Sequence, residues 1–166
     1  SGKTGATIWK FYTNEIGDGG WVYQVFGKMD FNEDGIYDAL AAAGDDSDDT
    51  GPKGIFMIDG YTGDSEWYTP LYGPAFSVIG VADFTGDGLN DVIAGASNES
   101  ETQGKVFGIN GANGQIMWSH NTQGSSVWGL APLGDINGDE IPDIMAGDFS
   151  GHYYFLDATN GNELQS

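Results

Sequence analysis

The nine-residue stretch DFNEDGIYD, from Asp30 to Asp38, returns twice along this chain. The copies read DFTGDGLND, from Asp83 to Asp91, and DINGDEIPD, from Asp135 to Asp143. The first aspartates of neighbouring copies lie 53 and 52 residues apart in a chain of 166 residues. The sequence is therefore an internal repeat, and its architecture must be one that is built from similar units.

Each copy places oxygen-bearing side chains at positions 1, 3, 5 and 9 of the stretch. Ca²⁺ takes about six to eight oxygen ligands, and a tight loop can direct alternate side chains and one backbone carbonyl toward a single point. Asp, Asn and Gly also favour ordinary turns, through hydrogen bonds from side chain to backbone. One copy alone would fit that simpler explanation, but three copies in the same register favour a cation site.

The stretch differs from an EF-hand, which needs a bidentate Glu at position 12 and a helix after the loop. Position 12 is an alanine in all three copies, and the residues that follow form short apolar runs bounded by glycine. Such runs predict buried strands. Asp38, Asp91 and Asp143 are therefore expected both to close the loop and to begin a strand, so that a bound metal would pin a β-hairpin.

Two copies depart from the best pattern for a cation. Thr85 offers a neutral hydroxyl at position 3, where the other copies have asparagine. Glu140 stands at position 6, where the other copies have a glycine and where a left-handed backbone is usually required. We therefore expect the first loop to bind a cation most tightly.

A second motif accompanies each loop. After the loop and its strand, an alternating strand enters a glycine-bearing turn, and a further strand follows that ends on Trp67, on Trp118 or, in the third copy, on Gln165. A strand with an aromatic residue precedes each loop, at Tyr23, Phe76 and Trp128. Four antiparallel strands in about fifty residues make one β-propeller blade.

The sequence thus predicts an all-β protein of three four-stranded antiparallel blades of about 52 residues each. As one repeat domain over residues 1–166, it divides into an outer strand of a preceding blade with its link (1–20) and three blades (21–68, 69–119 and 120–166). Since propellers close with about four to eight blades, three blades imply an incomplete ring or an open assembly. A longer parent propeller is the interpretation we favour; two chains completing one ring and head-to-tail stacking are the alternatives.

Connectivity also predicts the two ends of the blades. The acidic loops share one face with the glycine turns, while the variable segments 44–53, 95–104 and 147–151 lie on the opposite face, as binding loops often do. Four aspartates gather in the first of these segments, and they form either a solvated acidic tip or a site for a cation or a basic partner: Asp45, Asp46, Asp48 and Asp49.

Composition excludes several partners. The net charge is −20, with 25 acidic residues and five basic residues that are all lysine. Nucleic acid recognition depends on arginine and on a basic surface, so neither nucleic acid nor an anionic membrane is expected to bind. No apolar run has transmembrane length, and the start at Ser1 is expected to be a processed or truncated one.

The loop pattern DxNxDGxxD with the glycine-containing strand after it resembles the FG-GAP repeats of integrin-α-type propellers, over nearly the whole chain. The strand that ends on tryptophan is similar to the blades of pyrroloquinoline-quinone-like propellers. The first resemblance implies up to three Ca²⁺ ions as cofactors. Their ligands would be the side chains of Asp30, Asn32, Asp34 and Asp38, of Asp83, Thr85, Asp87 and Asp91, and of Asp135, Asn137, Asp139 and Asp143, with the backbone carbonyls of Ile36, Leu89 and Ile141.

We therefore expect a calcium-stabilised, non-catalytic β-propeller module for adhesion, recognition or surface assembly, with a protein or glycan ligand or other propeller blades as partners. Weak multi-aspartate sites fill where Ca²⁺ is near millimolar, which favours an extracellular, cell-surface or periplasmic location. Propeller enzymes, either polysaccharide lyases or quinone-dependent dehydrogenases, are the first alternative, and a filament subunit is the second. No catalytic motif is evident.

The remaining aromatic and histidine residues receive simpler roles. Trp9, Trp67 and Trp118 occupy one repeat position and are expected to fill the interfaces between blades. Trp21 falls outside that pattern and is the better candidate for a ring that stacks on a ligand. His120 and His152 have no partners at metal or triad spacing, and both are expected to be surface residues.

Overall fold

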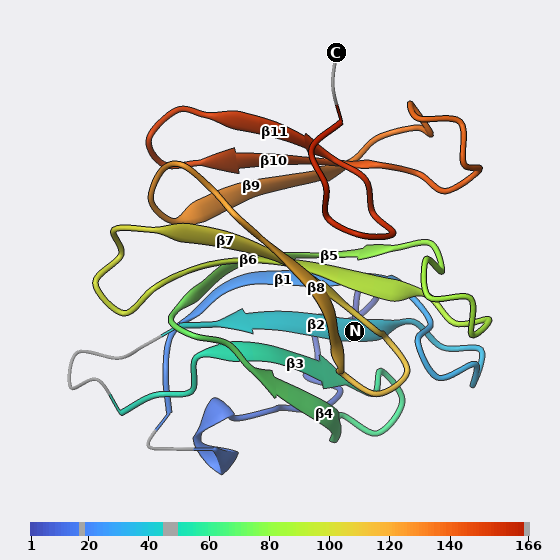
Figure 1. Ribbon diagram of the computed structural model, residues 1–166. Helices are drawn as coiled ribbons and strands as arrows, with labels where there is room; N and C mark the ends of the chain where they lie inside the picture. Colours follow the sequence, from blue (N-terminus) through green and yellow to red (C-terminus); the bar gives the residue numbers. More distant parts are fainter. Residues whose placement is uncertain (17–18, 45–49, 165–166) are drawn as a thin grey trace.

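The computed structural model describes residues 1–16, 19–44 and 50–164, which form three antiparallel sheets arranged like an open fan (Figure 1). The first sheet has the order β1-β2-β3-β4, with β1 Val22–Met29, β2 Asp38–Ala43, β3 Gly54–Ile58 and β4 Ser65–Pro70. The second has the order β5-β6-β7-β8, with β5 Ala75–Val81, β6 Asp91–Ser97, β7 Gly104–Ile109 and β8 Ile116–Asn121. The third has the order β11-β10-β9, with β9 Val127–Pro132, β10 Ile144–Asp148 and β11 Tyr153–Leu156.

The all-β prediction and the blade architecture are confirmed. Each sheet is a meander of consecutive antiparallel strands, and the three sheets do not close into a ring. In the third sheet a fourth strand is only begun, because Glu163 pairs with Leu156 through an isolated bridge and the Leu164 N–H donates to the Phe155 carbonyl. The predicted end of that strand at Gln165 and the predicted acidic tip from Asp45 to Asp49 lie outside the described residues.

The strands that begin at the first two acidic loops are deeply buried. β2 and β6 begin at Asp38 and Asp91, as predicted, and β10 begins one residue after Asp143. β2 reads DALAAA and β6 reads DVIAGAS, and nearly every residue of both strands is buried. Small side chains on both faces let neighbouring sheets approach closely, which a central strand of a blade requires.

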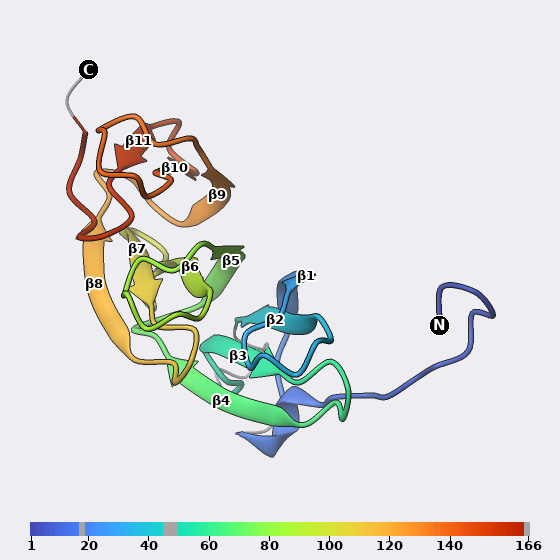
Figure 2. The same cartoon turned by 90° about the vertical axis from the view of Figure 1, so that its right-hand side faces the viewer.

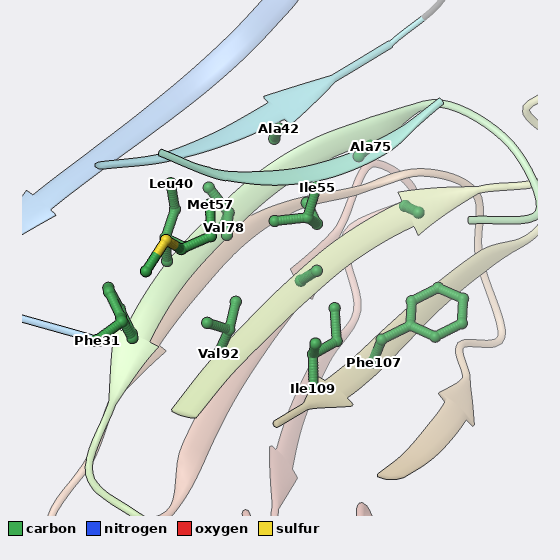
Figure 3. Close-up of a cluster of buried hydrophobic side chains, with 12 residues drawn as sticks. Phe31, Leu40, Ala42, Ile55, Met57, Ala75, Val78, Val92, Phe107 and Ile109 are labelled. Carbon is green, nitrogen blue, oxygen red and sulfur yellow. The ribbon is translucent and has the colours of Figure 1, made fainter. Parts of the chain in front are cut away.

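A period of two distributes the residues of β2 between two hydrophobic clusters. Leu40 and Ala42 face the second sheet, whereas Ala41 and Ala43 face the other way, toward the N-terminal segment. The cluster between the first and second sheets is the larger one and is filled by Phe31, Leu40, Ile55, Met57, Val78, Val92, Phe107 and Ile109, among others (Figure 3). Full burial of a side chain of this size contributes about 1.5–3 kcal/mol, so packing between sheets is a major source of stability.

The interface between the second and third sheets is built in the same way. Ile79, Val81, Ile93 and Val106 of the second sheet meet Val127, Ile144, Ala146, Tyr154 and Leu156 of the third. Strands β1, β5 and β9 contact one another in sequence at the inner edge of the fan, and β4 and β8 lie toward its outer side (Figure 2).

Three tryptophans, one from the N-terminal segment and one from each of the first two sheets, dock on the turn of the next sheet, which confirms the predicted interface position of Trp67 and Trp118. The indole N–H donates to a turn carbonyl in three equivalent bonds: Trp9 to Gly60 at 2.9 Å, Trp67 to Gly111 at 2.8 Å and Trp118 to Ala158 at 2.8 Å. Because each bond joins a tryptophan to the sheet that follows it in the chain, the three bonds run in one direction along the chain.

The N-terminal segment packs on the first sheet without forming a strand of its own. Residues 1–12 include no β-strand, and the 3₁₀ helix Thr13–Glu15 follows them. Trp9 and Phe11 cover Phe56 and its neighbours, with the Phe11 and Phe56 rings 5.1 Å apart. Since a strand is defined by its pairing, the assignment of residues 1–20 to a preceding blade stays a prediction.

The acidic loops all emerge on one side of the fan. They connect β1 to β2, β5 to β6 and β9 to β10, and Figure 1 shows all three at the right-hand end of the sheets. The β6–β7 and β10–β11 connections lie at the opposite end. In the part of the chain that the structure describes, no helix is long and apolar enough to cross a membrane.

Candidate metal-binding loops

The aspartate at position 9 closes each acidic loop. Its Oδ2 accepts a hydrogen bond from the backbone N–H at position 2, over 2.7 Å in the first loop, 2.8 Å in the second and 2.7 Å in the third. Asp38, Asp91 and Asp143 are almost fully buried because each lies at the start of a central strand. These three carboxylates therefore hold the loops in shape from within.

The aspartate at position 1 organises the middle of its loop. In the first loop, Asp30 accepts hydrogen bonds from the N–H of Glu33 at 2.7 Å and of Gly35 at 2.8 Å. Asp83 and Asp135 accept the same pair of bonds, from positions 4 and 6, over 2.6 to 2.9 Å. Three copies thus share one hydrogen-bond pattern as well as one sequence pattern.

This pattern requires a left-handed backbone at positions 4 and 6. The φ angles are 61° and 87° in the first loop, 79° and 95° in the second, and 87° and 73° in the third. Only the second loop has glycine at both positions, because Glu33 occupies position 4 of the first loop and Glu140 occupies position 6 of the third. A residue with a Cβ costs about 1–2 kcal/mol in this conformation, so two of the loops are strained.

Positions 3 and 5 turn their oxygens toward the backbone two residues further on. Asn32 accepts from the Asp34 N–H at 3.1 Å, and Asp34 accepts from the Ile36 N–H at 2.7 Å. The third loop repeats both bonds at 2.9 Å. In the second loop, the Thr85 hydroxyl lies 3.3 Å from Asp83 Oδ1 and 3.4 Å from Asp91 Oδ1, so it contacts two neighbouring carboxylates instead.

The carboxylates perturb one another electrostatically. Burial raises the pKa of Asp38, hydrogen bonds from the Phe31 and Gly60 N–H groups oppose that rise, and the charges of Asp30 and Asp34 add to it. The two outer carboxylates are therefore close enough to repel the buried one. A cation bound among them would relieve that repulsion.

Two of the outer carboxylates, Asp135 at position 1 and Asp87 at position 5, have the opposite tendency. Hydrogen bonds from the Gly138 and Glu140 N–H groups hold the pKa of Asp135 below its ordinary value. The Leu89 N–H and the Asn110 amide do the same for Asp87. These carboxylates are ionised at neutral pH, which is the form that a cation requires.

The chemistry of the donor set fits Ca²⁺. Every predicted side-chain ligand carries oxygen, and each loop brings four of them into one nine-residue turn. Within the described residues, no three Asp, Glu, His or Cys side chains converge on one point, because most of the loop carboxylate oxygens face backbone N–H groups. An ionised carboxylate has about four lone-pair sites, so these bonds leave acceptor capacity for a cation. When bound, the cation would supply positive charge that holds the loop carboxylates together.

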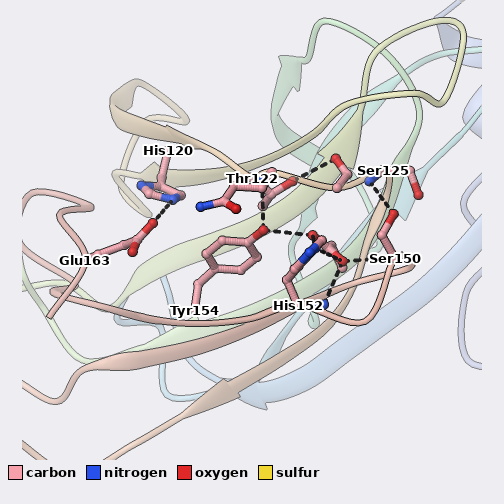
Figure 4. Close-up of polar contacts among 10 residues, drawn as sticks. His120, Thr122, Ser125, Ser150, His152, Tyr154 and Glu163 are labelled. Atoms are coloured by element: carbon pink, nitrogen blue, oxygen red, sulfur yellow. Dashed lines mark hydrogen bonds and ion pairs between the residues drawn. The ribbon is translucent and has the colours of Figure 1, made fainter. Parts of the chain in front are cut away.

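The prediction that both histidines are surface residues is confirmed for His152, which is exposed, and is wrong for His120. His152 Nδ1 lies 2.9 Å from Asp148 Oδ2, and the same oxygen accepts a 2.8 Å hydrogen bond from the Tyr154 hydroxyl (Figure 4). His120 is largely buried, with Nε2 3.4 Å from a Glu163 carboxylate oxygen and its ring 5.7 Å from that of Tyr154. The partners of His120 lie more than about thirty residues away in the chain, so local spacing does not indicate them.

Asp148 is the functional-looking residue that the repeat analysis missed. Its side chain is buried, and it stands where the first two sheets have Ala43 and Ala96. A signal was available in the sequence: an acidic residue at a position that is apolar in the other two repeats. The contacts of Asp148 are all within the third sheet and its link, so they explain a local structural role.

Aromatic rings gather at the ends of the inner strands away from the acidic loops. Tyr23, Phe76 and Trp128 come from equivalent positions of β1, β5 and β9, and the Phe76 and Trp128 rings are stacked 4.6 Å apart. Trp21 and Phe149 extend this group and are 56% and 77% exposed, respectively. The exposure predicted for Trp21 is confirmed, while its role as a ligand-stacking ring stays a prediction.

Comparisons with known proteins agree with the repeat. The FG-GAP repeat family matches residues 75–114, which cover β5, the second acidic loop, β6, β7 and the turn after β7. Integrin alpha-2 of Bos taurus is 30% identical over 156 residues, which cover 79% of this chain. Integrin alpha-V of Gallus gallus is 33% identical over 89 residues, or 52% of this chain, and integrin alpha-2 of Mus musculus is 35% identical over 83 residues, or 43% of it.

The chain spans only a small part of these relatives: 13%, 8% and 7% of the three integrin chains, respectively. The likeness therefore concerns the repeats and not the whole of an integrin. It agrees with the common geometry of the three acidic loops and with their place between the first two strands of each sheet. On these grounds, the chain carries FG-GAP repeats of the integrin-alpha type.

Proposed function

We propose that this chain is a calcium-stabilised recognition module of the β-propeller type, with adhesion to a protein or glycan ligand as its role. The repeats that it shares with integrin alpha chains support a module of this kind. The single observation that carries the calcium part is the recurrence of one oxygen-rich loop geometry, three times, on one side of the fan.

The proposal assigns the same five ligand positions to each loop. In the first loop, cation binding would offset the repulsion that Asp30 and Asp34 exert on Asp38. The proposed setting is extracellular or at the cell surface, since sites of this kind fill at Ca²⁺ concentrations near millimolar. The recognition surface proposed is the opposite face, where Trp21, Trp128 and Phe149 are exposed. The proposed organisation is a single repeat domain over residues 1–166, with an outer strand of a preceding blade and its link at 1–20 and blades at 21–68, 69–119 and 120–166.

Removal of calcium provides the test. Three sites occupied at 100 times their dissociation constant would each stabilise the fold by about 2.7 kcal/mol, so an excess of EGTA should lower the melting temperature by well over five degrees. Titration calorimetry with CaCl₂ should show up to three binding events. A CaCl₂ concentration of about 5 mM is roughly 5–50 times the dissociation constant of an extracellular Ca²⁺ site. A melting temperature that is the same in EGTA and at this CaCl₂ concentration would sink the proposal.

A pair of variants assigns the effect to the loops. Asp34→Ala removes a charged position-5 side chain that is exposed, and it should reduce calcium binding more than Thr85→Ala, which removes a neutral hydroxyl. Asp64→Ala is the matched control, because Asp64 is an exposed aspartate outside the loops. Equal losses in Asp34→Ala and Asp64→Ala, which change the charge by the same amount, would mean that calcium acts through net charge alone.

A further inference from the structure

The turn after the third strand of each sheet comes close to the acidic loop of the same sheet. Its first residue is Asp59 in the first sheet, Asn110 in the second and Asp157 in the third. Asp59 and Asn110 are each only 7% exposed, although both are polar. Since neither side chain belongs to the loop pattern, its burial against the loop requires an explanation.

In the second sheet the turn supplies hydrogen-bond donors to the loop. The Asn110 side-chain amide donates to Asp87 Oδ2 at 2.6 Å and to Thr85 Oγ1 at 3.2 Å. These are the oxygens at positions 5 and 3, which the proposed cation would also need. The amide hydrogens carry partial positive charge, so the neutral Asn110 side chain satisfies the two oxygens that a cation would otherwise bind.

In the first sheet the charge at this position is reversed. Asp59 Oδ2 accepts a hydrogen bond from the Asn32 amide at 3.3 Å, while its Oδ1 accepts from the Tyr61 and Thr62 N–H groups at 2.7 Å. A carboxylate donates nothing to Asp34. Instead it adds one negative charge beside the position-3 side chain of the first loop, and additional charge among the ligands increases affinity for Ca²⁺.

In the third sheet, the described residues show no hydrogen bond between the turn and the loop. Gly60 and Gly111 donate to Asp38 Oδ1 and Asp91 Oδ1 at 2.9 and 3.0 Å, and a Cβ on either glycine would lie 1.9 Å from a loop carbonyl. Ala158 takes this position in the third sheet. Among the described residues, the turn there donates no hydrogen bond to Asp143, and the Asp157 carboxylate accepts from Thr159 and Asn160 of its own turn.

We propose that the first residue of this turn sets the cation affinity of the loop beside it. Asp59 strengthens the first site by adding a carboxylate, and Asn110 stabilises the second loop in its metal-free form. Asp157 leaves the third loop unaffected because its carboxylate is bonded within its own turn and not to the loop. The inference rests on the proposed function, since it takes the ligand to be a divalent cation of the Ca²⁺ class. It assigns to the turns a role that the loop sequences alone do not contain.

A reciprocal exchange tests the inference. Asn110→Asp should tighten Ca²⁺ binding at one site by roughly tenfold or more, since a unit charge acts on a doubly charged ion about 4–6 Å away. Asp59→Asn should weaken binding at one site by a similar factor. Asp157→Asn is the matched control, and its Ca²⁺ affinities should stay within about twofold of those of the unmodified chain. Calorimetric titration with CaCl₂ measures all three.

Thermal unfolding in EGTA is a second readout that needs no bound metal. Asn110→Asp replaces an amide donor by a carboxylate that repels Asp87, so its melting temperature in EGTA should fall by several degrees, whereas Asp157→Asn should leave it unchanged. Circular dichroism in CaCl₂ establishes that each variant is folded. If Asn110→Asp does not fold, Asn110→Ala takes its place, with a lower melting temperature in EGTA and tighter Ca²⁺ binding expected.

The outcomes separate the inference from the proposed function. If the unmodified chain binds no Ca²⁺, the proposed function fails. If that chain binds Ca²⁺ and all three exchanges leave the affinities within twofold of it, the proposed function stands and the inference is overturned. Opposite shifts for Asn110→Asp and Asp59→Asn, with Asp157→Asn unchanged, support it.

Discussion

Two backbone positions decide how well each acidic loop holds its shape. Positions 4 and 6 must be left-handed so that their N–H groups reach the position-1 aspartate. The second loop has glycine at both positions, whereas Glu33 in the first loop and Glu140 in the third adopt the left-handed conformation at the cost of backbone strain. The glycine expected at position 6 was argued from the sequence, but the equal demand at position 4 is visible only in the structure.

Glu140→Gly should stabilise the protein. Glycine removes a strain of about 1–2 kcal/mol that the left-handed conformation costs a residue with a Cβ. Glycine also loses more conformational entropy on folding, which cancels part of this gain and leaves a stabilisation of about 1 kcal/mol. For a chain of this length the melting temperature should rise by roughly 2–4 °C. Thermal unfolding in CaCl₂ and in EGTA measures the change.

Glu140→Gln is the control for that experiment. It keeps the Cβ and removes only the charge, so it should leave the melting temperature in CaCl₂ within about 1 °C of the original. If the glutamine variant gains as much as the glycine variant, charge repulsion rather than backbone strain limits this loop.

The third sheet differs from the other two through a buried polar cluster. Asp148 accepts hydrogen bonds from Ser150 and His152 N–H groups at 2.9 and 3.0 Å and from the Tyr154 hydroxyl at 2.8 Å. Burial opposes ionisation of Asp148, but the hydrogen bonds from His152 and Tyr154 outweigh it and hold its pKa below the ordinary value. This cluster connects the β10–β11 hairpin to the link before β9, since Tyr154 also accepts from the Gln123 N–H.

Asp148→Asn should destabilise the third sheet in a pH-dependent way. Hydrogen bonds to a charged group contribute about 1.5–3 kcal/mol each. The Asn amide N–H₂ would face a group that donates to the Asp148 carboxylate, so the free energy of unfolding should fall by about 2 kcal/mol at pH 7. The folded-state pKa of Asp148 is lower than the unfolded one, so its contribution is present above the unfolded value of 3.8 and is lost as the pH falls through the folded value.

Urea unfolding of Asp148→Asn and of the original chain at pH 7, at pH 5 and below pH 3 measures that dependence. The difference between the two chains should be similar at the first two pH values and shrink at the lowest. The exposed Asp64→Asn exchange is the reference, with little difference at any pH. A difference that grows on acidification would contradict the assigned role of the ionised carboxylate.

At the scale of the whole molecule, charge dominates. A net charge of −20 is concentrated partly in three loops on one side of the fan. In the metal-free chain this repulsion is relieved only by screening, which extends over about 10 Å at 0.1 M salt and about 3 Å at 1 M. Stability without calcium should therefore depend on ionic strength more than stability with calcium does.

We expect that raising tetramethylammonium chloride from about 0.02 M to about 0.5 M will increase the melting temperature in EGTA by several degrees. The increase in CaCl₂ should be clearly smaller, because the loop charges are then neutralised. The tetramethylammonium ion is too large to enter the loops, so it separates screening from site binding. Equal slopes in the two conditions would show that the loops do not account for the repulsion.

The sequence alone predicted features that repeat and that are local. The strands beginning at Asp38 and Asp91, the hairpin position of the acidic loops and the interface position of Trp67 all follow from spacing and periodicity. Contacts between segments far apart in the chain were not predictable in this way. The Asn110 amide reaches Asp87 across 23 residues, and His120 meets Tyr154 of the next sheet, so both depend on how the sheets stack.

The tryptophan bonds to the turns of the following sheets imply an order in which the sheets assemble. Each indole N–H lies 51, 44 or 40 residues before the carbonyl that accepts it. During synthesis, each tryptophan ring therefore stays exposed to solvent until the next sheet has been translated and has formed its turn. Assembly then advances from the amino end, and each newly completed unit shelters the ring left open by its predecessor.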